Sequence, residues 1–385
     1  MADEPFLLTP GPLTTSMRVK RAMLRDWGSR DGDFIALNAE IRERLVALVD
    51  GGDAFTGGDA LTGGDAFTAV PLQGSGTFVV EAMLGTLVPR DGKLLVLVNG
   101  AYGERMVKIA GYHGRAVDTL TTAEDVSSDP AALDAKLGSD PSITHVAIVH
   151  CETTSGIVNP VAAVAEVVAR HKRRLLIDSM SAFGALPLSA RDIPFDAVVA
   201  SSNKCLQGVP GMGFCIVRKS ALAGAAGNAP SLVLDLFDQD RAMAGNGQWR
   251  FTPPTHVMAA FREAMREHED EGGVTGRGAR YAANCRILVE GMRALGFETL
   301  LPDELQAPII VTFRMPADER FHFETFYDRL RGRGYVIYPG KLTVAPSFRI
   351  GCIGDLHEAE MKGALAAIRE VLGEMNVSDG KAVAA

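Results

Sequence analysis

Two short apolar runs on either side of one lysine constrain the fold of this chain most strongly. The runs are residues 195–199 and 214–218, and between them lie Lys204 and the glycine-rich segment 207–213. β-Branched runs of this length, separated by a turn, are typical of buried strands. The sequence therefore predicts that Lys204 stands at the end of a strand, on backbone held by apolar packing on both sides.

An aspartate gives this lysine a chemical context. The apolar run 175–177 closes on Asp178, about one strand–helix–strand unit before Lys204. A lone lysine after a strand is most often a solvated loop residue. A lysine that can bond to a cofactor aldehyde, facing an acid that keeps a pyridine nitrogen protonated, instead suits a pyridoxal phosphate (PLP) site. The pair therefore favours a PLP site over the solvated-lysine alternative.

Length, charge and cysteine usage narrow the protein class. A chain of 385 residues, 47% of them apolar, predicts a large domain plus a smaller one. No apolar run is long enough to cross a membrane, and the start lacks the features of a signal peptide. A net charge of −8 without a basic stripe argues against nucleic acid as a partner. Five scattered cysteines predict buried thiols in a reducing cytoplasm, with no disulfide and no metal site.

Strand-like and helix-like segments alternate along most of the chain. Residues 93–98 form a strand-like run followed by Tyr102, and residues 145–150 form another followed by Thr153. Such alternation predicts an α/β fold whose mostly parallel sheet is covered by helices on both faces. Since polar side chains repeatedly follow strands, we expect one site at the carboxyl edge of the sheet. Tyr102 is suited either to stacking on a flat ring or to ordinary core packing.

A short glycine motif precedes the helix expected from Phe78. Ser75, Gly76 and Thr77 stand between a strand-like run and that helix. Glycines let backbone amides approach a phosphate, the helix N-terminus adds partial positive charge, and the two hydroxyls are further donors. The motif lacks the P-loop ending and the dinucleotide fingerprint, so a single phosphate monoester is the ligand it suits.

The C-terminal third predicts a separate α+β unit. A helical region over 256–295, interrupted at Gly272–Gly273, leads into alternating strands and helices up to residue 373. We expect an N-terminal arm (1–20), a large domain (21–272), a small domain (273–375) and a frayed tail (376–385). Arg349 lies within an apolar run of this unit. It suits either the solvated face of an edge strand or a clamp on a carboxylate or phosphonate.

Residues 51–68 contain a hexapeptide that is repeated three times. Glycine–aspartate repeats can form calcium-binding coils, but these copies lack the required nonapeptide pattern. The sequence favours a duplicated surface loop, inserted between a helix over 35–49 and the strand that precedes Ser75.

Taken together, these motifs resemble those of the class V (fold type I) PLP-dependent aminotransferases. The resemblance runs over residues 7–372 and is most specific at 8–14, 72–77, 99–103, 203–211, 249–252, 336–341 and 348–351. It implies a transfer of the amino group of 2-aminoethylphosphonate to pyruvate, giving phosphonoacetaldehyde and L-alanine. A serine– or alanine–glyoxylate aminotransferase of the same fold is the nearest alternative. The repeat at 51–68 departs from the family pattern.

The resemblance also implies roles for individual residues. Lys204 would bond to PLP and Asp178 would pair with its ring nitrogen, while Arg349 would bind the anionic group of the substrate, assisted by Arg30. The residues implied to contact the cofactor or the substrate elsewhere are Gly11, Ser75, Gly76, Thr77, Tyr102, Thr153, Met180, Asn203, Thr252 and Thr255. Of these, Thr252 and Thr255 would reach the phosphate held by a neighbouring subunit, which implies a homodimer with shared sites.

Two alternatives belong to other functional classes. A cysteine desulfurase needs a mobile catalytic cysteine, and Cys352 lies in a segment that the sequence predicts to be an ordered strand. The other alternative is a phosphate-binding module without catalysis, in which Lys204 is only a positive charge.

Overall fold

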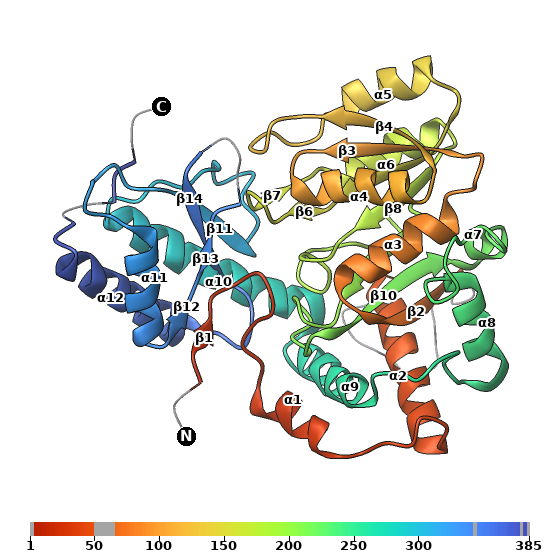
Figure 1. The fold of residues 1–385 in the computed structure, drawn as a ribbon, viewed down its shortest axis with the longest axis horizontal. Coiled ribbons are helices and arrows are strands. Elements are labelled where there is room, and N and C mark those ends of the chain that lie inside the picture. The colour runs from red at the N-terminus through yellow and green to blue at the C-terminus, as the bar shows by residue number, and fades with distance from the viewer. Residues whose placement is uncertain (1–3, 50–65, 342–344, 378–379, 383–385) are drawn as a thin grey trace.

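The computed structural model describes residues 4–49, 66–341, 345–377 and 380–382 (Figure 1). Its centre is a seven-stranded sheet in which six strands run in the same direction and β10 runs opposite to them. In spatial order the strands are β2 (Phe67–Gly74), β10 (Gly211–Arg218), β9 (Ala197–Ser201), β8 (Arg174–Asp178), β5 (Ile143–Val149), β3 (Lys93–Val98) and β4 (Ala116–Thr121). The predicted mostly parallel sheet is confirmed.

Alternate residues of each central strand enter two separate cores, one on each face of the sheet. In β3, Leu95 and Leu97 pack on one face, whereas Leu94, Val96 and Val98 pack on the other. Burial on both faces explains why these strands are continuous apolar runs. One face is covered by α2 (Gly32–Val49), α5 (Pro130–Ser139), α6 (Val161–Arg170) and α9 (Thr255–Asp270). The other is covered by α3 (Gly76–Leu87), α4 (Ala101–Tyr112), α7 (Lys219–Ala223) and α8 (Leu236–Asn246).

A smaller α+β unit follows α9 and lies beside the large sheet in Figure 1. Gly272 and Gly273 both have positive φ, so the chain turns sharply at the predicted break before α10 (Gly273–Ala294). The unit contains a three-stranded sheet, with β14 (Ser347–Gly351) between β11 (Ile310–Arg314) and β13 (Tyr338–Pro339). Its other helices are α11 (Phe323–Gly332) and α12 (Glu358–Glu374).

The N-terminal segment belongs to this smaller unit through β1 (Phe6–Leu7), which pairs in parallel with β12 (Tyr335–Val336). Leu8 is buried in the core of the smaller unit. The chain then crosses to the large sheet, where α1 (Met17–Arg21) and η1 (Ala22–Leu24) pack against α9. The N-terminal segment therefore connects the two parts of the molecule.

Two local expectations are corrected or refined by the structure, and a third is not tested by it. The expected frayed tail is held at several points: Val377 is buried, the Gly380 N–H donates to Leu295 O, and Lys381 O accepts from the Ala317 N–H. The glycine-rich turn after Lys204 is shorter than expected, since Gly211 already begins β10. Most of the hexapeptide repeat, residues 51–65, lies outside the described residues.

The prediction of buried thiols is confirmed, because all five cysteines are free and buried. None of the helices in the described ranges combines the length and the apolar character needed to cross a bilayer.

Candidate active site

The site begins with Asp178 and Lys204 at one edge of the large sheet. Asp178 is the last residue of β8, and Lys204 stands in the turn that follows β9. Each side chain has an electrostatic effect on the pKa of the other. Lys204 Nζ donates a 2.7 Å hydrogen bond to the carbonyl oxygen of Pro10. Asp178 and Lys204 therefore follow neighbouring strands at the same edge of the sheet, and their predicted roles stay predictions.

Burial changes the proton affinity of both groups. Asp178 is only 3% exposed, and its carboxylate accepts from the Met180 N–H at 2.9 Å. Burial outweighs that bond and raises the pKa of Asp178 to about 6. Burial also lowers the pKa of Lys204, against the opposing effects of Tyr102 and Asp178. The site thus holds an acid short of positive charge next to an amine that favours its neutral form.

The glycine motif lies at the N-terminus of α3 and faces Met180. A Cβ at Gly76 would stand 2.4 Å from the Met180 sulfur, so a larger residue there would displace the end of the Met180 side chain. Ser75 precedes the helix, and its side chain makes no capping hydrogen bond. Thr77 Oγ1 accepts a 3.1 Å bond from Arg105 Nη1. A helix N-terminus, two hydroxyls and a guanidinium suit a phosphate dianion.

Arg349 reaches the same region from β14 of the smaller unit. It is 6% exposed, so the alternative of a solvated edge face is wrong. Its Nη1 donates to Thr153 O at 2.8 Å and its Nε to Pro339 O at 3.1 Å. Burial lowers the pKa of Arg349, which also interacts electrostatically with Lys204 and Tyr102. Arg349 thus contacts Thr153, and both Tyr102 and Arg349 interact electrostatically with Lys204; the roles predicted for these residues stay predictions.

The N-terminal corner lies directly against Lys204. Gly11 has a φ of 118°, and a Cβ there would stand 2.6 Å from the Cδ of Lys204. The Asn203 carbonyl oxygen would be 2.9 Å from the same Cβ. Gly11 is required both by its backbone conformation and by this close approach. The structure thereby places Gly11 and Asn203 beside the lysine.

Three predicted site residues lie elsewhere on this chain. Arg30 is exposed in the turn ahead of α2, Thr252 is exposed, and Thr255 begins α9. None of the hydrogen bonds, ion pairs or ring contacts among the described residues joins them to Lys204 or Asp178. Their roles stay predictions.

The charges and donors grouped at the sheet edge fit PLP. Lys204 matches its aldehyde, buried Asp178 its ring nitrogen, and the N-terminus of α3 its phosphate.

Comparison with known proteins gives the family. The model of the class-V aminotransferases matches residues 74–351. A 2-aminoethylphosphonate–pyruvate transaminase of Pseudomonas putida is 55% identical over 379 residues, which cover 98% of this chain and 100% of that protein. This chain belongs to the class-V aminotransferase family.

Solved structures agree with this class-V fold. A ureidoglycine–glyoxylate aminotransferase of Bacillus subtilis superposes with a TM-score of 0.87 at 23% identity, over 98% of this chain and 95% of that one. A PLP-bound phosphoserine aminotransferase of Trichomonas vaginalis gives 0.75 at 16% identity, over 95% and 100%. At these identities the likeness shows the fold alone, and it confirms the predicted fold class.

Two charged residues that contact predicted site residues were not themselves predicted from the sequence. Arg105 lies in α4, one turn after Tyr102, with its guanidinium carbon 4.8 Å from the centre of the tyrosine ring. The spacing of three residues from Tyr102 along a helix was the available signal in the sequence. The contact of the Arg105 side chain with Thr77 depends on how α4 packs beside α3.

The second missed residue is Glu152, which is fully buried. Its carboxylate accepts from the backbone N–H groups of Tyr102, Gly103 and Thr154 and from the Thr154 hydroxyl. Burial raises the pKa of Glu152, and the Thr154 bonds oppose that shift. Glu152 therefore fixes the start of α4, and with it Tyr102.

Proposed function

We propose that this class-V aminotransferase uses PLP to transfer the amino group of 2-aminoethylphosphonate to pyruvate, releasing phosphonoacetaldehyde and L-alanine. The proposal is supported by three buried charged groups that interact electrostatically, Lys204, Asp178 and Arg349, and by the hydrogen bond that ties Arg349 to Thr153 O. The name of the P. putida relative, which matches nearly the whole chain, supports the choice of substrates.

The residues at the sheet edge would hold the cofactor. Ser75, Gly76, Thr77 and Arg105 would bind its phosphate, and Asp178 would keep its ring nitrogen protonated. When bound, PLP supplies a ring that accepts electrons from the substrate carbon bearing the amino group. The ring contacts would come from Tyr102, Thr153, Met180 and Asn203.

Lys204 would first hold the cofactor and then act as the base. Its lowered pKa favours the neutral amine, which can take a proton from the amino-bearing carbon of the substrate. The bond from Nζ to Pro10 O restricts where that amine lies. Lys204 would return the proton during transfer to pyruvate, so one group serves both half-reactions.

Arg349 would bind the anionic end of each substrate. Its bonds to Thr153 O and Pro339 O fix the plane of the guanidinium, and its remaining N–H groups can donate to the oxygens of a phosphonate or a carboxylate. One arginine can therefore serve both 2-aminoethylphosphonate and pyruvate. Arg30 is a second candidate for the extra charge of the phosphonate, and Gly11 would line the substrate side.

A homodimer would complete the site through Thr252 and Thr255. Large apolar side chains are exposed near Thr252: Phe251 (44%), Leu232 (70%) and Val233 (57%). Arg250 Nη1 donates to Leu232 O, which holds these two segments together. We expect Val233→Glu to turn a dimer into a monomer in sedimentation velocity and to weaken PLP retention. A monomer that retains PLP as tightly as the wild type would contradict the shared site.

The deciding assay measures the amino product formed with a panel of donor and acceptor pairs. We expect the highest kcat/KM with 2-aminoethylphosphonate and pyruvate, and loss of both turnover and bound-PLP absorbance in Lys204→Ala. A higher kcat/KM with serine or alanine and glyoxylate would support the alternative aminotransferase. Normal turnover by Lys204→Ala would reject the proposed role of the lysine.

A further inference from the structure

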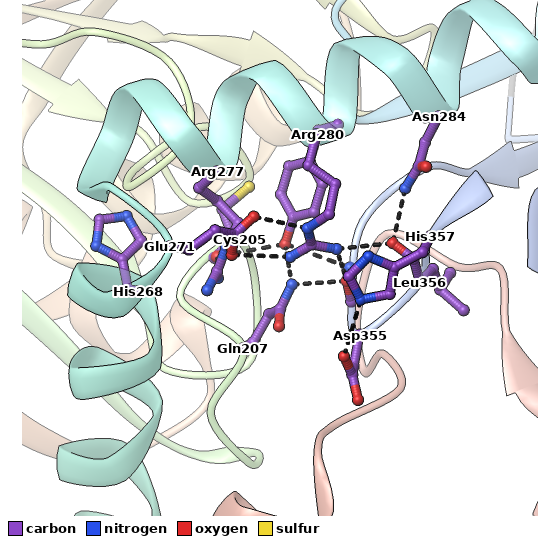
Figure 2. Close-up of polar contacts among 12 residues, drawn as sticks. Cys205, Gln207, His268, Glu271, Arg277, Arg280, Asn284, Asp355, Leu356 and His357 are labelled. Atoms are coloured by element: carbon purple, nitrogen blue, oxygen red, sulfur yellow. Dashed lines mark hydrogen bonds and ion pairs between the residues drawn. The ribbon is translucent and has the colours of Figure 1, made fainter. Parts of the chain in front are cut away.

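A buried ionic network at the start of α10 has no role in the function proposed above. Figure 2 shows its members, which come from α9, α10, the Lys204 turn and the segment after β14. Glu271, in the turn between α9 and α10, pairs with both Arg277 and Arg280. Arg277 is 1% exposed. Burying a guanidinium costs desolvation free energy, so the contacts that compensate this cost hold Arg277 in place.

One set of contacts leads to the turn that carries Lys204. Arg277 Nη1 donates to the carbonyl oxygen of Cys205, the residue after the lysine. The Tyr281 hydroxyl lies 3.4 Å from the same oxygen. Gln207, in the same turn, donates from Nε2 to Tyr281 Oη at 2.6 Å. We call Gln207, Arg277 and Tyr281 the Lys204 brace.

The conformation of Gln207 shows that these side-chain contacts hold the turn. Its φ is 57°, a left-handed value that a side chain such as glutamine seldom adopts. Its N–H donates to Lys204 O at 2.8 Å, and the next N–H, of Gly208, donates to Ser202 O at 2.7 Å. Such a conformation persists only where surrounding contacts stabilise it. Here the side-chain amide of Gln207 supplies two such contacts, one to Tyr281 and one to Gly354.

The same brace reaches the segment that follows Arg349. Gln207 Nε2 also donates to Gly354 O at 2.6 Å, three residues beyond the end of β14. The Gly354 N–H in turn donates to the Tyr281 hydroxyl at 3.3 Å. The turn that presents Lys204 is therefore tied by direct hydrogen bonds to the segment that follows β14, the strand that carries Arg349.

We propose that Gln207 and Arg277 are positioning residues that fix Lys204 relative to Arg349. The proposal rests on the proposed role of Lys204 as the transferring amine. A lysine side chain is flexible, so its reach depends on where its backbone is anchored. Misplacing a reacting group by about 1 Å can cost on the order of 100-fold in rate. The brace thus acts on the rate of proton transfer and leaves substrate binding at Arg349 in place.

The test compares Gln207→Asn, Arg277→Lys and a matched control, Asn284→Ala. Asparagine tolerates the left-handed conformation but is too short for both bonds of Gln207, and lysine keeps the charge of Arg277 without its fork. Asn284 lies two turns further along α10 and donates to Cys352 O and Leu356 O, away from the Lys204 turn. Its loss removes the same number of hydrogen bonds without touching the brace.

We expect kcat to fall about 10- to 100-fold in Gln207→Asn and Arg277→Lys, with KM for both substrates within about 2-fold. Hydrogen–deuterium exchange of the Gln207 and Gly208 amides, measured without substrate, should accelerate in both variants. Asn284→Ala should change neither kcat nor that exchange, even if it lowers Tm.

Unchanged kcat in Gln207→Asn, or a lower kcat without faster exchange at residues 207 and 208, would overturn the proposal. If Arg277→Lys does not fold, Gln207→Asn decides alone. Failure of the proposed function has a different signature, namely turnover retained by Lys204→Ala, which leaves the exchange result unaffected.

Discussion

Two carboxylates, the buried Asp178 and the partly buried Glu271, show how the site differs from the framework around it. Asp178 accepts from the Met180 N–H, and burial raises its pKa to about 6. Glu271 is also desolvated, but the hydrogen bonds and charges of Arg280 and Arg277 lower its pKa to about 2. Glu271 is paired with two arginines of the same network, whereas Asp178 forms no ion pair among the described residues. A protonated ring nitrogen of a bound cofactor could supply the positive charge that pairs with Asp178.

The largest expected effect is a loss of activity when Asp178 is replaced. Asp178→Asn keeps the shape of the side chain but cannot hold a proton on the ring nitrogen, so we expect kcat to fall at least about 1,000-fold. The same variant should not destabilise the apoprotein, because it removes an unpaired buried acid. Steady-state kinetics and thermal unfolding measure the two effects. A kcat of Asp178→Asn within about 10-fold of the wild-type value would contradict a role in activity that separates Asp178 from Glu271.

Replacing Glu271, in contrast, should lower the stability of the protein. Glu271→Gln leaves Arg277 buried without its counter-charge, and we expect the free energy of unfolding to fall by about 3 kcal/mol in urea denaturation. Glu374→Gln is the matched control, since Glu374 also pairs with two arginines, Arg329 and Arg333, but at an exposed site. Its loss should cost less than about 1 kcal/mol. Equal losses would show that burial does not matter here.

The two carboxylates should respond to pH with opposite signs. The pKa of Asp178 is raised in the folded apoprotein, so wild type should lose up to about 3 kcal/mol relative to Asp178→Asn as pH rises from about 4 to 6. The pKa of Glu271 is lowered, so wild type should lose its advantage over Glu271→Gln as pH falls from 4.5 toward 2. Thermal unfolding of PLP-free protein across this range measures both. Slopes of the same sign would contradict the comparison.

A smaller effect concerns the positive charge at the phosphate end of the site. Arg105→Met removes the guanidinium that contacts Thr77, and we expect the Kd for PLP to rise about 10-fold. Lys108→Met makes the same change of charge at an exposed position of α4 and serves as the control. Equilibrium dialysis of PLP measures both. An equal rise in Lys108→Met would mean that net charge, rather than contact, attracts the phosphate.

The sequence by itself determined the features that depend on neighbours along the chain. Apolar runs buried on both faces predict the strands, and the residues that follow them predict Asp178, Lys204 and Thr153 at one edge, because parallel strands end together. The turn before α3 is equally local, since Ser75, Gly76 and Thr77 act through backbone geometry and a helix terminus.

Only the tertiary structure decided which distant segments meet this edge. Pro10 accepts from Lys204 across 194 positions, Arg349 donates to Thr153 across 196, and Arg277 donates to Cys205 across 72. Each of these contacts depends on how the smaller unit and the N-terminal corner pack against the large sheet. A local pattern fixes where a side chain stands on its own element, but it carries no information about which element packs opposite.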